Sequence, residues 1–160
     1  MKKIIVVCGP TATGKSDYAV ELAKNISGEV ISADSRQVYV GMDKGSGKIT
    51  KREMKGVPHH LLDVANPKRT FSVAQYKKLS KDVIDDIIAR GKTPILCGGT
   101  GFYIDAVICD TIFPSVPPNK TLRAALAKKS LESLQQKLRA LDPRRYALVD
   151  QKNKVRLIRA

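Results

Sequence analysis

The sequence predicts an α/β fold in which helices flank a parallel β-sheet, followed by a small basic helical segment at the C-terminus. Short apolar runs with strand character alternate with stretches of helical periodicity, and two of these runs lead directly into glycine-rich turns. The 160 residues are enough for one domain with a small appendage. Residues 115–160 carry 12 basic and 3 acidic side chains, so most of the net charge of +14 lies in this last part.

The first predicted element is a strand buried on both faces over Ile4–Cys8, because this run is continuously apolar and Gly9 follows at once. A helix is predicted over Ser16–Lys24, before strand character returns over Glu29–Ala33. The apolar face expected for this helix consists of Tyr18, Ala19, Leu22 and Ala23. Together these elements form a βαβ unit.

The α/β alternation then repeats. A helix is predicted over residues 72–90, because Ser72 and Gln75 have the spacing of a capping box. Pro94–Cys97 follows as a short buried strand that opens into glycines, and residues 102–107 suit a further helix.

Two segments lie outside these units. Residues 40–58 are polar and contain several glycines, and they are long enough for a functional loop. The proline-bearing run 113–118 marks a boundary between a core of residues 1–114 and a basic segment of residues 115–160. In that segment an amphipathic helix is predicted behind Ser130, a possible N-cap. Its apolar face consists of Leu131, Leu134, Leu138 and Leu141.

Composition narrows the classes of protein to consider. No apolar run approaches the ~20 residues of a membrane span, and the apolar stretch after Lys3 is too short for a secretory signal, so we expect a cytoplasmic protein with no membrane partner. We also expect a monomer. The three cysteines lack metal-site spacing, and those that end apolar runs, Cys8 and Cys97, are expected as buried thiols. The positive charge favours a polyanionic partner, although a merely soluble lysine-rich face has the same composition.

A GxxxxGKS motif lies between the first predicted strand and the helix after it, which is the context of a phosphate-binding P-loop. The motif consists of Gly9, Pro10, Thr11, Ala12, Thr13, Gly14, Lys15 and Ser16. Its backbone N–H groups can point inward, Lys15 can neutralise phosphate oxygens, and the Ser16 hydroxyl can ligate Mg²⁺. The sequence therefore predicts a P-loop NTPase-like sheet with a site for a di- or triphosphate.

Asp34 is the first candidate for a base or a metal partner, because it follows a strand at the edge where open α/β sheets bind ligands. A loop aspartate can equally be a turn residue, and both interpretations stay open. His59 and His60 point to opposite faces of a strand and have no acidic or cysteine partner at suitable spacing. Structural or substrate-contacting histidines are therefore expected rather than a zinc site.

Six motifs occur in a fixed order along the chain. They are Gly9–Ser16, Asp34–Tyr39, Gly56–Asp63, Gly91–Leu96, Gly98–Tyr103 and Arg156–Ala160. In this order they resemble the bacterial tRNA dimethylallyltransferases, also called isopentenyltransferases, over nearly the whole chain. The resemblance implies transfer of a dimethylallyl group from dimethylallyl diphosphate to the exocyclic N6 amine of the tRNA adenosine 3′ of the anticodon, with release of diphosphate.

The resemblance also implies roles for individual residues. The P-loop holds the leaving diphosphate, whose charge Lys15 and a Mg²⁺ ion on Ser16 stabilise. Asp34 accepts the proton of the amine, and Thr100 hydrogen-bonds near the diphosphate or the target nucleotide. The residues implied to contact tRNA are Asp34, Ser35, Arg36, Gln37, Thr100, Arg123, Arg156 and Arg159.

The chain departs from the family pattern in two places. Residues 41–48 read Gly-Met-Asp-Lys-Gly-Ser-Gly-Lys where family members usually have Gly-x-Asp-Ile-Gly-Thr-Ala-Lys, so Lys48 is retained. Family members also continue past the pair that is here Arg159–Ala160, with further core elements, more tRNA-binding surface and a second basic group for the diphosphate. Two other functions remain open at this point: a P-loop kinase of small molecules or nucleotides, and an inactive tRNA-binding fragment.

Overall fold

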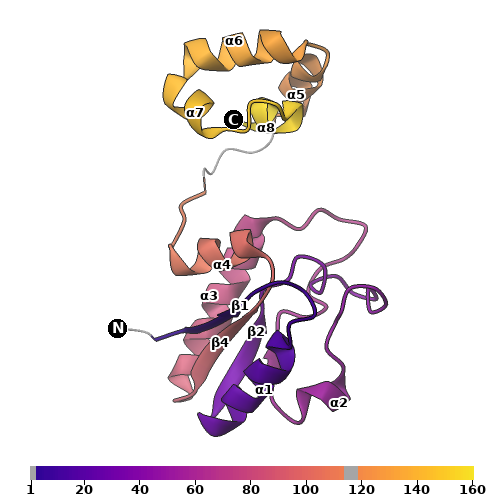
Figure 1. The fold of residues 1–160 in the computed structure, drawn as a ribbon, viewed down its shortest axis with the longest axis vertical. Coiled ribbons are helices and arrows are strands. Elements are labelled where there is room, and N and C mark those ends of the chain that lie inside the picture. Colours follow the sequence, from indigo (N-terminus) through magenta and orange to yellow (C-terminus); the bar gives the residue numbers. More distant parts are fainter. Residues whose placement is uncertain (1–2, 114–118) are drawn as a thin grey trace. The chain divides into compact units, whose positions relative to one another are not determined.

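The computed structural model describes residues 3–113 and 119–160. The chain divides into two compact units, Met1–Phe113 and Pro114–Ala160 (Figure 1). This division lies one residue before the boundary expected from the sequence, and the roles expected for the two parts stay predictions. The prolines of the predicted boundary segment, within residues 114–118, lie outside the described residues.

Unit 1 is built on a parallel sheet, as predicted. Its strands are β1 (Ile5–Cys8), β2 (Gly28–Ser32), β3 (His59–His60) and β4 (Thr93–Gly98), in the spatial order β1-β4-β2-β3. Every neighbouring pair is parallel. The carboxyl ends of β1, β4 and β2 therefore lie at one edge of the sheet, where the loops that follow them meet.

Helices cover both faces of this sheet. Helix α1 (Lys15–Asn25) packs on one face, and α3 (Val73–Ala89) and α4 (Gly101–Ile108) pack together on the other (Figure 1). A short helix, α2 (Lys51–Met54), interrupts the long loop between β2 and β3. The predicted capping box of α3 is confirmed: the Ser72 hydroxyl accepts from the Gln75 N–H, and the Gln75 side chain accepts from the Ser72 N–H.

Two expectations about buried side chains are wrong. Strand β1 is half-buried, and Cys8 is exposed, because among the described residues β1 lies at an edge of the sheet with a neighbour on one side. Only an interior strand has both faces and both edges covered, and β4 meets that condition, so Cys97 is buried as expected. On α1, Tyr18 is 59% exposed, and Val20 is buried beside Ala19 and Ala23 instead.

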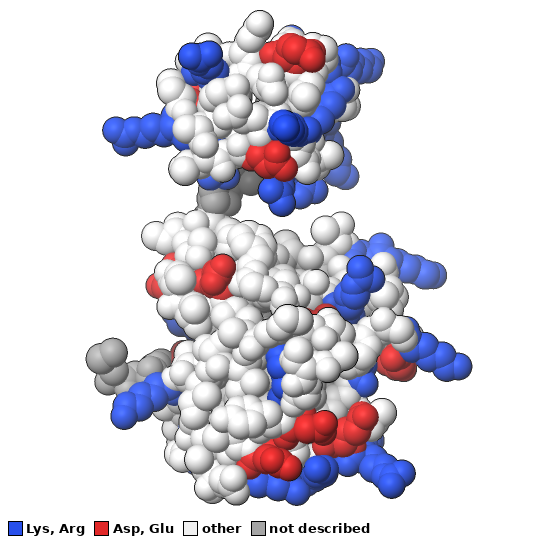
Figure 2. Space-filling view, in the orientation of Figure 1, with Lys and Arg blue, Asp and Glu red and all other residues white. Residues whose placement is uncertain are grey.

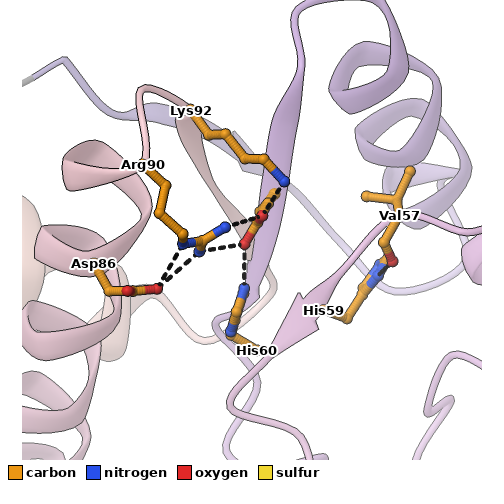
Figure 3. A network of polar contacts seen from close by, with 7 residues as sticks. Val57, His59, His60, Asp86, Arg90 and Lys92 are labelled. Carbon is orange, nitrogen blue, oxygen red and sulfur yellow. Dashed lines mark hydrogen bonds and ion pairs between the residues drawn. The ribbon is translucent and has the colours of Figure 1, made fainter.

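The two adjacent histidines have separate partners. The His60 Nε2 lies 2.7 Å from a carboxylate oxygen of Glu29, which is buried in β2, while the His59 Nδ1 lies 2.9 Å from the Val57 carbonyl oxygen. Figure 3 shows that His59 and His60 point in different directions from β3. Since Glu29 comes from a distant part of the sequence, spacing alone could not reveal this contact.

The Glu29 carboxylate is the centre of a charged network. Arg90 donates two hydrogen bonds to it, at 2.5 and 2.8 Å, and Lys92 donates one at 2.6 Å (Figure 3). Asp86 in turn holds the Arg90 guanidinium. The hydrogen bonds from Arg90 keep the pKa of Glu29 well below its ordinary value despite burial, and Lys92 and His60 add to this effect. The network joins β2, β3 and the connection between α3 and β4.

Unit 2 is a small helical body, as predicted for the C-terminal segment. Its helices are α5 (Lys120–Ala127), α6 (Leu131–Leu141), α7 (Pro143–Leu148) and α8 (Lys154–Arg159). Ser130 caps α6 through the Ser133 N–H, as the sequence predicted. The buried core of the unit consists of Leu134, Leu138 and Leu157, whereas Leu141 is exposed. Along the described stretches of the chain, no helix is long and apolar enough to cross a membrane.

Candidate functional site

The GxxxxGKS loop joins the end of β1 to the start of α1, in agreement with its sequence context. Gly14 caps α1 with a left-handed backbone (φ 79°), a conformation that glycine adopts without strain. The Lys15 ammonium donates to the carbonyl oxygen of Pro10 in the same loop, and the Thr13 hydroxyl donates to the same carbonyl at 2.9 Å. The Lys15 ammonium has two further N–H groups, which can donate to a bound phosphate.

Asp34 follows β2 at the same edge of the sheet and holds its own turn together. Its Oδ1 accepts hydrogen bonds from the backbone N–H groups of Arg36 at 2.8 Å and Gln37 at 3.3 Å. Its Oδ2 makes no hydrogen bond with any residue that the structure describes. The turn thus fixes the carboxylate and leaves one oxygen for a ligand, so the two interpretations of Asp34 as a turn residue and as a functional group are compatible.

Thr100 connects the end of β4 to the turn after β2. The Ser35 N–H donates to its Oγ1 at 2.9 Å, and the Thr100 hydroxyl lies 3.3 Å from the Ser35 Oγ. The Thr100 N–H also donates to the Ala33 carbonyl oxygen at 3.1 Å. This close approach requires glycine at position 98, because a Cβ there would lie 2.2 Å from the Ala33 oxygen.

These segments line one open cavity of about 620 Å³. Its lining residues are Thr11–Asp17, Asp34–Gln37, Gly45–Gly47 and Cys97–Thr100. Most of the site residues predicted in unit 1 therefore line this one cavity, although Gly9 and Pro10 do not. The Gly45–Gly47 wall lies in the polar, glycine-bearing segment 40–58 that was expected as a functional loop, but none of its three residues was predicted as part of the site.

Cys97 lies in the floor of this cavity. Its thiol is 3.7 Å from the Lys15 carbonyl oxygen, and burial raises its pKa to about 11. The thiol consequently stays protonated at neutral pH, which does not suit a nucleophile. Cys97 is therefore a packing residue between β4 and α1.

The sequence predicts the Ser16 hydroxyl as a ligand of Mg²⁺. Ser16 lies in the first turn of α1, is exposed and lines the cavity. Within residues 3–113 and 119–160, no group of three His, Cys, Asp or Glu side chains could hold a metal ion. This donor set fits Mg²⁺, which commonly takes few protein ligands and completes its shell with water and substrate phosphate oxygens.

The three arginines expected to contact RNA lie in unit 2. Arg123 is on α5, and Arg156 and Arg159 are on α8, which packs against α5. All three are exposed, and the ion pair that the Arg156 side chain makes with the described part of the chain is a long one, of 3.7 Å to Asp150. Lys and Arg side chains outnumber the acidic ones on the visible face of unit 2 (Figure 2).

The parallel sheet and the GxxxxGKS loop between its first strand and first helix define a P-loop-like α/β protein. A family model described as IPP transferase matches residues 37–160. The chain belongs to this family.

Relatives and solved structures agree with this assignment. A tRNA dimethylallyltransferase from an Exiguobacterium species is 46% identical over 100% of this chain and 53% of its own length, and one from Geobacillus thermodenitrificans is 45% identical over 99% and 52%. The crystal structure of a tRNA isopentenylpyrophosphate transferase from Bacillus halodurans matches with a TM-score of 0.71 at 42% identity, over 99% of this chain and 54% of that one. A eukaryotic dimethylallyltransferase acting on tRNA matches with a TM-score of 0.86 at 27% identity, over 99% and 40%. The chain thus spans about half the length of the curated relatives it matches.

Proposed function

We propose that this chain takes part in the transfer of a dimethylallyl group from dimethylallyl diphosphate to the N6 amine of the tRNA adenosine 3′ of the anticodon. Family membership and the names of its relatives support this reaction. The observation that carries the proposal is the single cavity in which a phosphate-type loop, Asp34 and the Ser35–Thr100 pair lie together. We place the reaction in the cytoplasm and assign it to a monomer.

The donor diphosphate binds at the GxxxxGKS loop in this proposal. The N-terminus of α1 contributes backbone N–H groups and positive potential, and Lys15 adds a full positive charge. Ser16 would hold Mg²⁺, which when bound neutralises part of the charge of the leaving diphosphate. Lys15 acts in the same direction as charge develops on the diphosphate, so the loop favours cleavage of the allylic C–O bond.

The acceptor adenine lies next to Asp34. Its N6 nitrogen forms a bond with the allylic carbon while the C–O bond breaks, and the diphosphate leaves with the electron pair. The Oδ2 of Asp34 accepts the proton that N6 loses, since Oδ1 is engaged by the turn. Thr100 fixes Ser35 beside this carboxylate, so we assign it a positioning role near the acceptor. Ser35 and Arg36 are exposed at the cavity and are available to neighbouring nucleotides.

The tRNA body contacts unit 2. Exposed arginines are suited to phosphate groups, because the guanidinium is always charged and donates several hydrogen bonds. Arg123, Arg156 and Arg159 meet this requirement. The net charge of +14 also favours association with a polyanion.

An assay of reaction products tests the proposal. The chain is incubated with tRNA and radiolabelled dimethylallyl diphosphate, and we expect labelled RNA and free diphosphate in equal amounts. Asp34→Asn serves as the matched inactive variant. Labelling of a small acceptor from ATP would instead indicate a kinase, and tRNA binding without any labelled product would indicate an inactive binding fragment; either outcome contradicts the proposal.

A further inference from the structure

The Gly45–Gly47 wall is the part of the cavity that does not directly follow a strand or begin a helix. Its position therefore depends on side chains that reach it from elsewhere. The Gln37 Nε2 donates to the Gly47 carbonyl oxygen at 2.9 Å, and the Gln37 Oε1 lies 3.3 Å from the Ser32 hydroxyl. Gln37 thus ties this wall to the end of β2, three residues after Asp34.

Lys48 follows this wall directly and is deeply enclosed. Its side chain is 7% exposed, and its ammonium donates to the Asp63 carboxylate at 2.5 Å, the Asp43 carboxylate at 2.7 Å and the Tyr39 carbonyl oxygen at 2.9 Å. Burial opposes the charge of Lys48, but the hydrogen bonds to Asp43 and Asp63 outweigh it, so its pKa lies above the ordinary value. The loop of residues 39–48 and the turn at Asp63 therefore meet at one ammonium group.

Asp63 reaches Lys48 from an unfavourable turn. Leu61 and Asp63 both have left-handed backbones, with φ of 61° and 56°, a conformation that costs energy in a bulky residue such as leucine. The turn directs the Asp63 N–H to the Gln37 carbonyl oxygen at 3.2 Å and its carboxylate to Lys48. The backbone N–H of Asp63 thus holds Gln37 and its carboxylate holds Lys48, and these are the two residues that position the wall.

We propose that Lys48 and Asp63 form a clasp that fixes the Gly45–Gly47 wall and so shapes the half of the cavity that receives the acceptor nucleotide. Lys48 is a positioning residue, because it contacts the wall's neighbours and does not line the cavity. The clasp acts on the acceptor half of the cavity because the wall is hydrogen-bonded to Gln37, which lies in the same turn as Asp34. The diphosphate loop shares none of the clasp's contacts. This inference rests on the proposed function for the identity of the two ligands.

Steady-state kinetics with the unsubstituted chain, Lys48→Met and Lys48→Arg test the clasp. We expect Lys48→Met to raise the KM for tRNA by about tenfold while the KM for dimethylallyl diphosphate changes less than about twofold. Lys48→Arg keeps the charge and should recover much of the loss. The matched control is Lys44→Met, since Lys44 is an exposed lysine of the same loop without a hydrogen bond or ion pair to the described residues. Equal effects on both KM values, or equal effects of Lys48→Met and Lys44→Met, would overturn the inference.

Binding and hydrogen exchange keep the clasp testable if no transfer occurs, an outcome that would count against the proposed function alone. With inorganic diphosphate and an anticodon stem-loop RNA as probes, Lys48→Met should weaken binding of the RNA by about tenfold and leave diphosphate binding unchanged. Amide exchange in residues 40–48 should become faster in Lys48→Met and in Asp63→Asn. The double variant should show little more than the larger single effect, because both changes break one contact. Unchanged exchange in that segment would refute the clasp.

Discussion

One carboxylate oxygen of Asp34 accepts hydrogen bonds within its own turn, and the other can accept a hydrogen bond from a ligand in the cavity. We expect Asp34→Asn to leave tRNA binding nearly unchanged, because asparagine retains the size and the acceptor oxygen that caps the turn. The transfer rate should fall by about 10²- to 10⁴-fold, since the amide cannot accept the N6 proton. Single-turnover rates and filter binding measure the two effects, and an unchanged rate would remove Asp34 from the mechanism.

Glu29 is 1% exposed, and its carboxylate forms ion pairs with two cations, Arg90 and Lys92, and also contacts a histidine, His60. Glu29→Gln removes the carboxylate that Arg90 and Lys92 share, although Arg90 keeps its ion pair with Asp86. We expect a loss of about 2 kcal/mol in the free energy of unfolding at pH 7, since both cations can turn toward water. Urea unfolding monitored by circular dichroism measures this loss.

The same carboxylate predicts how stability changes with pH. The folded pKa of Glu29 lies below its ordinary value of 4.5, so its contribution is fully present above that pH and is lost as the pH falls below it. The difference in stability between the unsubstituted chain and Glu29→Gln should therefore shrink between pH 5 and pH 3, a window set about the ordinary value. Glu21→Gln, on the exposed side of α1, is the control and should change stability little at any pH. A difference that stays constant over this range would contradict the role of the charge.

At the scale of elements, Gly98 decides how closely β4 approaches the end of β2. A Cβ at this position would lie 2.2 Å from the Ala33 oxygen, so Gly98→Ala must move the two segments apart. We expect a loss of about 1–3 kcal/mol in stability together with lower transfer activity, because the Thr100–Ser35 contact depends on this approach. Thermal unfolding and the transfer assay measure both effects.

Gly101→Ala is the matched control for this change. Gly101 begins α4, and a Cβ there would have no neighbour within 4 Å among the described atoms. The substitution should therefore be neutral or slightly stabilising, because alanine favours the helix. Equal destabilisation by both substitutions would show that the close approach at Gly98 is not the cause.

The sequence predicted the local parts of the fold better than the contacts between distant residues. The loop before α1 and the caps at Ser72 and Ser130 were recognisable, because each depends on residues within a few positions of one another. The partners of His60 and Lys48 were not, since Glu29 and Asp63 are brought to them by the fold. The exposure of Cys8 depends on β1 being an edge strand, and strand order is not visible in local patterns.

For the whole molecule, the dependence of tRNA affinity on salt reports how many phosphates the protein contacts. Replacing Arg123, Arg156 and Arg159 with glutamine should reduce the slope of log K against log salt by about 0.7 per contact on single strands and about 0.9 on duplex stems. Diphosphate binding at the Gly9–Ser16 loop should survive, because it depends on unit 1 alone.

A second triple variant distinguishes the loss of phosphate contacts from the loss of net positive charge. Lys24, Lys68 and Lys78 are exposed lysines of unit 1, and their replacement with glutamine removes the same charge. This variant should change the slope much less than the arginine variant does. A lower melting temperature with an unchanged slope in the arginine variant would instead mark those arginines as structural.

No strand among residues 3–113 and 119–160 pairs with the outer edge of β1, which bears on how this chain behaves at high concentration. Ile5–Val6–Val7 contains no charge and no proline, and its outer backbone groups can pair with the same strand of another copy. The net charge of +14 keeps copies apart at low ionic strength, and added salt screens that repulsion. The apparent molar mass from light scattering should consequently rise with salt and with protein concentration, which sets the range in which binding can be measured on dispersed molecules.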